Sequence, residues 1–440
     1  MGSSEAGKQA EMTTSHRVLR AQAERLRESR PLRVAVEAIA TAPGGGLSYL
    51  RSQLPELEHR DISLLVFART EVAADLRDAL RSPASAVRVV DGKSRVERLR
   101  FIHTRLAVEA QRWGAEVLYC PGSTAPFRTK GIPTVVCVQN PHLFGADVPR
   151  SLQLAILRPV AWISVLRAEE LVHISGSTAT EFSLHSGLRR SYSVIPSGLG
   201  QLEQAARPPT GSRRDTIVVV SNLYAYKRID EVLAAFAAER GLHDSYKLVI
   251  AGDEIEVGLR GRLEDLASAL GCAESVWFTG FLTRDELLDL YQRAAALVSA
   301  SRQEAFPLPP GEALALSVPV VLSDIPSHRE LYGRWASLVP PGDVAGLGHA
   351  MLSAVRRGCV PDGQVAELKA TFSWERNGEA LARILRRAAI TSPAKRRLQA
   401  MQLSALPRAV RAVIGQATQA VPRPSSCQDQ EGTKCRGRGR

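Results

Sequence analysis

The order of short apolar runs is the feature that most limits how this 440-residue chain can fold. From residue 31 to about residue 390, runs rich in Val, Ile and Leu alternate with amphipathic stretches of helical spacing. The runs read LRVAVEAIA, DISLLVFA, AEVLYC, IPTVVCVQN, ELVHIS and SYSVIP in the first half, and DTIVVVSN, YKLVIAG, SVWFTG, AALVSAS, VPVVLSD and ASLVPP in the second. Most lack polar alternation, which is typical of strands buried on both faces of a parallel sheet. The pattern predicts a doubly wound α/β fold.

Two such series are separated by GLGQLEQAARPPTGSRRD, a polar stretch with the composition of a linker. We therefore predict two Rossmann-like domains, at residues 31–205 and 206–373. Residues 1–30 are expected to form an N-terminal extension. Residues 391–440, which end in CRGRGR, are expected to form a basic, flexible tail.

The charge is unevenly distributed along the chain. Of the net charge of +12, residues 391–440 carry +8 and residues 1–30 carry +2, so the body between them is nearly neutral. A cationic tail attracts any polyanion and names no partner by itself. No window holds eighteen consecutive apolar residues, the start lacks the apolar core of a secretion signal, and six cysteines lack metal-ligand spacing. These features favour a cytoplasmic protein with reduced, buried thiols.

The segment ASRQEAFPLPPGEALALSVPVVLSD, residues 300–324, places Glu304 and Glu312 eight positions apart beside apolar runs. A carboxylate is costly there unless something binds it. Glu304 is predicted in the loop at the carboxyl end of a strand, where open α/β sheets bind ligands. Pro309 and Pro310 suit the first positions of a new helix, so Glu312 is predicted in its first turn, beside N–H groups that suit a phosphate. Alternatively, Glu312 only caps its helix and Glu304 is a solvated loop residue.

Two further residues are predicted at the same edge of the second sheet. Lys227, in VVVSNLYAYKRIDEVLAAF, lies between a strand and a helix, where it can neutralise a diphosphate. Its alternative role is that of a surface lysine at a helix start. Gly280, in FTGFLTRDEL, follows another strand and can let a flat ring approach the backbone.

Together these motifs resemble glycosyltransferase family 4, the retaining group 1 sugar transferases of GT-B fold. The resemblance rests on SNLYAYKRID, LVIAGD, the stretch from VWFTG to PSHREL, and PPGD, in the family's order. It is weaker in the first half, in PGGGLSYL, IPTVVCVQN, ISGSTATEF and VIPSG. FSWERNGEALARIL resembles the family's closing helix, which implies that residues 374–390 return to the first domain. The resemblance implies two domains facing each other across a cleft.

The resemblance also implies roles for individual residues. Lys227 would contact the donor diphosphate and, with Glu304 at the donor sugar, carry catalysis. Glu312 would hold the ribose hydroxyls. The remaining donor-side contacts would come from Asn222, Gly280, Phe281, Phe306 and Leu308, and those to phosphate or acceptor from Gly45, Gly46, Asn140 and His142.

The chain departs from the family pattern at four places. Asn222 stands where the family often has an arginine, and Pro307 where it often has a glycine. Gln139-Asn140 occupies a position at which many members have a histidine, and Ser317 replaces a common glycine near a helix end. The first three departures leave open a degenerate, non-catalytic member that binds and positions a partner.

The implied activity is hexosyl transfer, with retention, from a nucleotide-diphosphate-sugar to a saccharide or lipid-linked acceptor in bacterial surface polysaccharide or glycolipid synthesis. The leaving diphosphate would be stabilised electrostatically without a metal or other cofactor, and the sequence contains no Asp-x-Asp pair. A retaining glycosidase gives Lys227 no role, and a dehydrogenase needs a G-x-G-x-x-G motif that PGGGLS does not supply. We expect the basic tail to attach the protein to the anionic inner face of the plasma membrane. Nucleic acid is not expected as a partner, because no aromatic residues interleave the basic ones.

Overall fold

The computed structural model describes residues 30–41, 44–92, 94–139, 152–186, 190–199 and 214–390. The predicted basic tail and all of the predicted extension except Arg30 lie outside these ranges. So do the boundary near residue 205 and two predicted site residues, Asn140 and His142.

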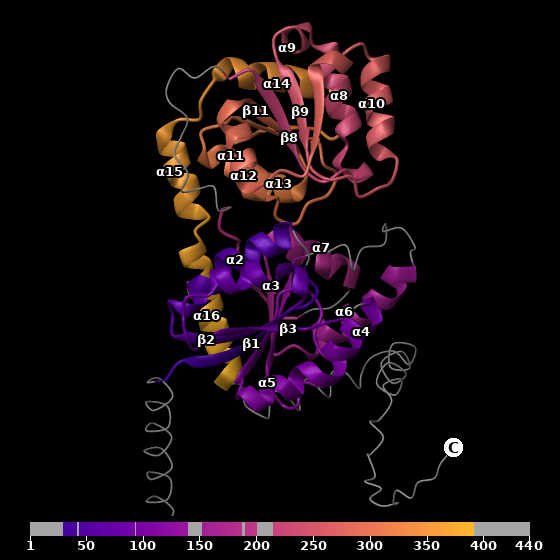
Figure 1. The fold of residues 1–440 in the computed structure, drawn as a ribbon. Helices are drawn as coiled ribbons and strands as arrows, with labels where there is room; N and C mark the ends of the chain where they lie inside the picture. The colour runs from indigo at the N-terminus through magenta and orange to yellow at the C-terminus, as the bar shows by residue number, and fades with distance from the viewer. Residues whose placement is uncertain are drawn as a thin grey trace, which may run out of the picture.

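The first domain is built on a parallel sheet of seven strands in the order β3-β2-β1-β4-β5-β6-β7 (Figure 1). Its strands are β1 (Leu32–Ala38), β2 (Ile62–Ala68), β3 (Ala86–Val89), β4 (Val117–Cys120), β5 (Thr134–Val138), β6 (Glu170–His173) and β7 (Ser193–Val194). Its helices are α2 (Gly45–Glu58), α3 (Thr70–Ala79), α4 (Arg95–Phe101), the π-helical η1 (Ile102–Leu106), α5 (Ala107–Trp113), α6 (Leu152–Arg167) and α7 (Gly176–Ser186).

The second domain contains a parallel sheet of six strands in the order β10-β9-β8-β11-β12-β13. Its strands are β8 (Thr216–Val220), β9 (Lys247–Ala251), β10 (Val276–Gly280), β11 (Ala294–Ser299), β12 (Val320–Ser323) and β13 (Ser337–Val339). Its helical segments are η4 (Ala225–Lys227), α8 (Ile229–Ala238), α9 (Arg240–His243), α10 (Leu259–Ala269), η5 (Ala273–Ser275), α11 (Arg284–Arg293), α12 (Leu308–Ala315), α13 (Pro326–Tyr332), α14 (Val344–Arg357) and α15 (Asp362–Thr371). The helix α16 (Trp374–Ile390) follows them.

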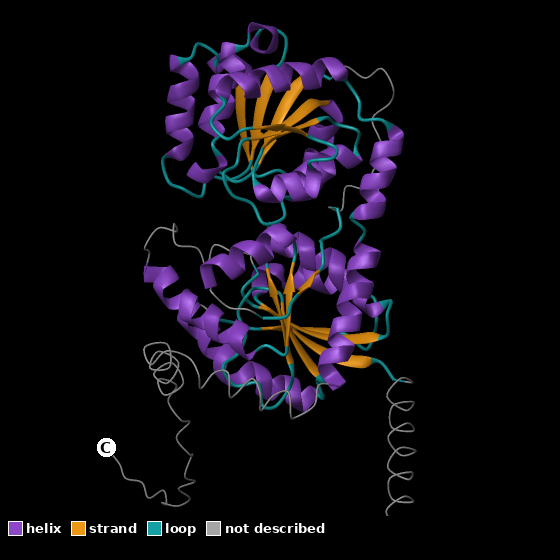
Figure 2. Cartoon of the chain, turned by 180° about the vertical axis from the view of Figure 1, so that it is seen from behind, coloured by secondary structure: helices purple, strands orange, loops and turns teal. Residues whose placement is uncertain are grey.

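Both sheets are doubly wound, which confirms the predicted fold class. In each sheet the chain first builds strands toward one edge and then returns to the other side of its first strand, between β1 and β4 and between β8 and β11. Ligands in such sheets bind outside the carboxyl ends of the strands at this switch point. Figure 2 shows the two domains stacked with helices on both faces of each sheet. This is the GT-B arrangement that the resemblance implies.

All twelve predicted runs contain strands, but β3 was not predicted. Its sequence AVRV alternates between exposed and half-buried positions, because this strand lies at the sheet edge and pairs only with β2. By contrast, all seven residues of β2 are buried. Because only one face of the edge strand β3 is covered, its sequence contains no long apolar run.

The last helix, α16, crosses back to the first domain and packs against α2 (Figure 1). Leu381, Leu385 and Ala388 of α16 are buried in the core of the first domain. Asn377 accepts a hydrogen bond from Gln53 Nε2 of α2 at 2.9 Å, and Arg387 forms an ion pair with Glu170 of β6 at 2.7 Å. The chain thus returns after the second domain to complete the first.

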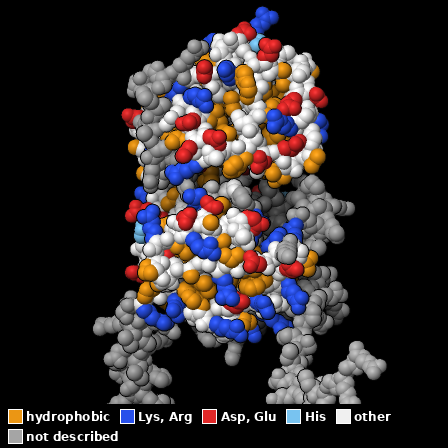
Figure 3. Space-filling view, in the orientation of Figure 1, with side chains coloured by type: hydrophobic (Ala, Val, Ile, Leu, Met, Phe, Trp, Pro, Cys, Tyr) orange, Lys and Arg blue, Asp and Glu red, His pale blue; other side chains and the backbone are white. Residues whose placement is uncertain are grey.

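The charged side chains and the cysteines of the described residues are distributed as follows. Figure 3 shows acidic and basic side chains interspersed over the second domain. In the described part of the chain, no helix is both long and apolar enough to span a membrane. Cys120, Cys137 and Cys272 are buried free thiols, but Cys359 is exposed, which corrects the expectation that the thiols are buried.

Candidate active site

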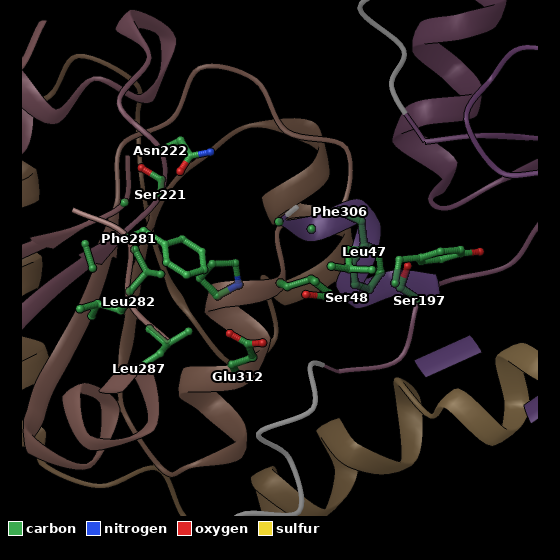
Figure 4. Close-up of a pocket in the computed structure, with 18 of the residues that line it drawn as sticks. Leu47, Ser48, Ser197, Ser221, Asn222, Phe281, Leu282, Leu287, Phe306 and Glu312 are labelled. Carbon is green, nitrogen blue, oxygen red and sulfur yellow. The ribbon is translucent and has the colours of Figure 1, made fainter. Parts of the chain in front are cut away.

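A cavity of about 710 Å³ lies between the two domains (Figure 4). The first domain lines it with the start of α2, with α3 and with residues that follow β5, β6 and β7. The second domain contributes residues after β8 and β9, the start of α11 and the segment that leads into α12. The cavity therefore lies at the carboxyl ends of strands from both sheets, where the topology predicts a ligand site.

The two residues predicted to carry catalysis contact each other. Lys227 Nζ lies 2.5 Å from Glu304 Oε1, and both side chains are largely shielded from solvent, at 15% and 12% exposure. Lys227 ends η4 after β8, and Glu304 follows β11, the neighbouring strand at the switch point. The Lys227 ammonium also lies 5.1 Å from the centre of the Tyr226 ring. The ion pair sets a positive and a negative group side by side at the edge of the sheet.

A second cavity of about 210 Å³ is lined by both residues of this pair. Lys227 is among the residues that line it but not among those that line the larger cavity. Glu304, Asn222 and Tyr226 line both. A ligand phosphate in the larger cavity would therefore reach Lys227 across the space that Glu304 and Tyr226 share.

Glu312 is a buried carboxyl group whose side chain extends from α12 toward the larger cavity (Figure 4). Its Oε2 accepts a hydrogen bond from the Tyr291 hydroxyl at 3.1 Å. Burial raises the pKa of Glu312 to about 7, while the Tyr291 hydrogen bond and the charge of Arg284 lower it by less. One hydroxyl donor leaves the carboxylate with further lone pairs for hydroxyl groups of a ligand.

The start of α12 differs from the prediction in two respects. The helix begins at Leu308, so Glu312 is its fifth residue and lies beyond the first turn. Pro309 and Pro310 lack an N–H group, so only Leu308 and Gly311 of the first four residues can donate from the backbone. This helix start is a poorer phosphate site than a typical one, because most of its donors are missing.

The loop after β10 forms another part of the cavity wall. Gly280 has a φ of +73°, a left-handed conformation that glycine adopts at little cost. It ends β10, and the next residue, Phe281, is exposed and lines the cavity with Leu282. The Phe281 N–H donates to Asp253 Oδ1 at 3.1 Å, and the Asp253 N–H donates to Asn222 Oδ1 at 3.1 Å. The loops after β8, β9 and β10 are thus tied together.

The first domain brings only part of its predicted residues to the cavity. Gly45 lines it as the first residue of α2, whereas Gly46 is not among the lining residues. Gly44, which sequence reasoning did not single out, lines the cavity with a φ of +114° and caps α2 without a side-chain hydrogen bond. Gln139, noted as a departure from the family pattern, also lines the cavity. The start of α2, whose first N–H groups have no partner within the helix, therefore borders the cavity.

Phe306 and Leu308 both line the cavity. Phe306 packs against Phe372, with ring centres 5.6 Å apart, and contacts the cores of both domains. The Phe306 side chain therefore anchors the segment that carries Glu304 against both domains.

Several cavity residues carry no motif that a single sequence reveals. Gly252, after β9, is fixed by close packing, since a Cβ there would lie 2.1 Å from the Ser221 carbonyl oxygen. The G in LVIAGD could have signalled this close approach. The other lining residues that sequence reasoning missed include Arg51, Glu71, Asp75, Ser197, Tyr226, Arg284 and Leu287. Arg51 and Asp75 form an ion pair at 3.2 Å on the first-domain wall.

No group of three or more His, Cys, Asp or Glu side chains that could hold a metal ion occurs among the described residues.

Comparison with known proteins finds a family match in the second domain. The model of glycosyl transferases group 1 matches residues 201–360, which contain Lys227, Glu304 and Glu312. Residues 201–360 are therefore similar to the group 1 glycosyltransferases. The alignments of the chain with the first curated relatives are partial and span between 16% and 47% of their lengths.

Two curated relatives and one solved structure illustrate what this chain is similar to. It is 36% identical to the O-antigen chain mannosyltransferase RfbU of Salmonella typhimurium strain LT2 over 100 residues, 23% of this chain and 28% of RfbU. It is 27% identical to the D-inositol 3-phosphate glycosyltransferase of Nocardiopsis dassonvillei over 310 residues, 65% of this chain and 68% of the relative. The crystal structure of Anabaena Alr3699/HepE in complex with UDP-glucose covers 85% of this chain and 100% of its own, with a TM-score of 0.59 and 17% identity. At this identity the structural likeness shows the GT-B fold alone.

Proposed function

We propose that this chain is a group 1 glycosyltransferase that transfers a hexose, with retention of configuration, from a nucleotide-diphosphate-sugar to a saccharide or lipid-linked acceptor. The observation that carries the proposal is the ion pair of Lys227 with Glu304, because Glu304 lines the cavity between the two domains together with Glu312. The similarity to RfbU, and the UDP-glucose bound in HepE, support a nucleotide-sugar donor and a role in bacterial surface polysaccharide or glycolipid synthesis.

In the proposed reaction the donor separates the Lys227–Glu304 ion pair. The diphosphate becomes the counter-ion of Lys227, and Glu304 is freed to accept hydrogen bonds from the donor sugar. As the glycosidic bond breaks, negative charge grows on the diphosphate, and the ammonium of Lys227 stabilises it in a cleft shielded from water. The proposed front-face attack passes the acceptor's proton to the leaving phosphate, so no metal ion or other cofactor is required.

The nucleoside is proposed to bind between α12 and the loop after β10. Phe281 offers an aromatic face for the base, and Glu312 offers lone pairs for the ribose hydroxyls. The charged groups on the opposite wall, Arg51, Glu71 and Asp75, suit an acceptor rich in hydroxyl groups.

A non-catalytic, donor-binding protein is the second candidate. It is favoured by the uncharged Asn222 where the family often has an arginine, and by the N–H groups missing at Pro307, Pro309 and Pro310. Both changes reduce stabilisation of the leaving group but leave the cavity open to a nucleotide.

Thermal unfolding with UDP, GDP, TDP and ADP, and with their sugar conjugates, tests the donor class. A nucleotide at about one hundred times its dissociation constant should add roughly 2.7 kcal/mol to stability, which raises the melting temperature by a few degrees. Lys227→Ala should abolish this gain and Glu312→Gln should reduce it, whereas Glu264→Gln, which changes an exposed residue of α10, should keep it. Release of the nucleoside diphosphate in the presence of saccharide acceptors then separates an enzyme from a binding protein. Failure of every nucleotide to stabilise the wild type would contradict the proposal.

A further inference from the structure

Helices α7 and α13 meet across the cleft, one from each domain (Figure 1). The backbone N–H groups of Gly176 and Ser177, in the first turn of α7, each donate to one carboxylate oxygen of Glu330 in α13, both at 2.6 Å. α7 has no acidic residue in its own first turn. A carboxylate from the second domain therefore satisfies two N–H groups of this helix start and complements its dipole.

The same helix of the first domain contacts both neighbours of Glu304. Ser175 Oγ, directly before α7, donates to the Ala305 carbonyl oxygen at 3.0 Å. Gln303 Nε2 donates to Glu181 Oε1 of α7 at 2.7 Å. Glu304 lies between Gln303 and Ala305, which both form hydrogen bonds with the first domain. The orientation of Glu304 therefore depends on the distance between the two domains.

Hydrogen bonds within the second domain also hold the segment of residues 301–305. Ser301 Oγ donates to the Gln303 carbonyl oxygen at 3.0 Å, and Ser323 Oγ donates to the Ser301 carbonyl oxygen. His328 Nδ1 of α13 lies 2.8 Å from the Ser323 carbonyl oxygen, which can only accept, so Nδ1 carries the hydrogen. α13 thus supports the base of the segment that carries Glu304 and also presents Glu330 to the first domain.

We propose that Glu330 is a positioning residue: by holding the start of α7 it keeps the domains closed and fixes the orientation of Glu304. This inference rests on the proposed function. Glu330 is not among the residues lining the cavity, so it acts through the contacts of α7 with Gln303 and Ala305. The donor binds chiefly to the second domain, whereas the reaction needs the closed cleft. Loss of Glu330 therefore lowers kcat and leaves nucleotide affinity unchanged.

The test compares the full-length wild type with Glu330→Gln and with Glu264→Gln as matched control. Glu264 is an exposed α10 residue that pairs with Arg260, so its loss removes an equivalent charge away from the cleft. For Glu330→Gln we expect kcat to fall about tenfold, the effect of losing one charge-assisted contact. The nucleotide dissociation constant should stay within about twofold of wild type, and small-angle X-ray scattering should give a larger radius of gyration. Glu264→Gln should match the wild type throughout.

Gly176→Ala approaches the same contact from the other side. A Cβ at Gly176 would lie 3.1 Å from Glu330 Oε1, so alanine pushes the carboxylate away without removing it. If both changes act through this contact, the double variant loses no more kcat than Glu330→Gln alone. An additive loss, or a fall in nucleotide affinity that matches the fall in kcat, would overturn the positioning role.

Measurements of nucleotide binding, turnover and radius of gyration separate the role of Glu330 from the proposed function. If the wild type binds no nucleotide and shows no turnover, the proposed function fails, and scattering alone decides whether Glu330 holds the domains together. If the wild type is active and Glu330→Gln has the same kcat and radius of gyration, the positioning role is wrong while the transferase stands.

Discussion

At the scale of single residues, Ser317 has a backbone conformation that its side chain disfavours. It follows α12 with a φ of +63°, in the left-handed region where glycine is usual. Its hydroxyl group is buried and has no hydrogen-bond partner among the described residues. The family's common glycine at this position is thus explained by backbone conformation.

Ser317→Gly should stabilise the protein by about 1 kcal/mol, because it relieves left-handed strain and removes a buried unpaired hydroxyl. Chemical denaturation measures the change. Ser268→Gly, in α10, is the matched control and should destabilise by about 0.5 kcal/mol, because its backbone is already helical. Equal effects of the two substitutions would contradict the explanation.

Glu37 is a buried carboxyl group near the end of β1. Its Oε1 accepts the N–H groups of Ile39 and Ala40 at 2.8 and 3.1 Å, while Oε2 has no partner among the described residues. Burial raises the pKa of Glu37 to about 7, more than the two backbone hydrogen bonds lower it. The folded state therefore holds this proton more tightly than the unfolded state.

The sign of the pH effect follows from this raised pKa. With Glu37 protonated, its contribution to the free energy of unfolding is fully present below pH 4.5, the pKa of this group in the unfolded chain. The contribution is lost as pH rises through 7, where the folded state must ionise the buried carboxyl group. Glu37→Gln cannot ionise, so its stability relative to wild type should increase between pH 5 and pH 8, on the order of 2 kcal/mol. Urea unfolding of both proteins at the two pH values measures the difference. A difference that does not change with pH would mean that Glu37 titrates normally.

At the scale of elements, the contact of α16 with α2 depends on a glycine. A Cβ at Gly378 would lie 2.5 Å from Glu56 Cβ and 3.3 Å from the Glu56 carbonyl carbon. The two helices can pack this closely only where one of them lacks a side chain. The hydrogen bond between Gln53 and Asn377 crosses the same contact.

Gly378→Ala should destabilise the protein by about 1–3 kcal/mol, because the added methyl group overpacks the helix contact. The matched control is Gly363→Ala in α15, where a Cβ would have no atom within 4 Å. The control should stabilise by roughly 0.5–1 kcal/mol through helix propensity alone. Thermal unfolding compares the two. A neutral Gly378→Ala would show that α2 and α16 can separate without cost.

At the scale of the whole molecule, the first domain depends on a helix that follows the second. Trp374, Leu381, Ile384 and Leu385 of α16 are buried in the first domain's core. Burial of these side chains contributes roughly 10 kcal/mol as an upper estimate, which is as large as the net stability of a typical domain. The second domain contains its own sheet and helices up to α15.

A fragment of residues 31–205 should therefore not unfold cooperatively by itself, whereas the same fragment joined through a flexible linker to residues 374–390 should do so. Circular dichroism during heating measures both, with residues 206–373 as a fragment expected to unfold cooperatively. If residues 31–205 alone unfold cooperatively at the temperature of the fusion, α16 is dispensable for the first domain.

The fold class and the main donor-side residues could be predicted from sequence because both depend on local signals. Buried parallel strands are continuous apolar runs, and Lys227 and Glu304 directly follow two such runs. Both runs lie at the switch point of one sheet, so the residues meet there. β3 escaped prediction because an edge strand covered on one face carries no such run. The position of Glu312 beyond the first turn depended on where α12 begins, and helix ends are weakly encoded.

The contacts between segments far apart in the chain depended on the tertiary structure. No local pattern in the sequence joins Glu330 to the start of α7, 154 residues away, or sets Gly378 against Glu56. The ion pair between Lys227 and Glu304, and the pKa values of about 7 for Glu37 and Glu312, likewise arise from burial and from neighbours on other elements. Periodicity along a sequence reports which face of an element is covered. It does not report what covers that face, because packing brings together residues whose separation along the chain carries no signal.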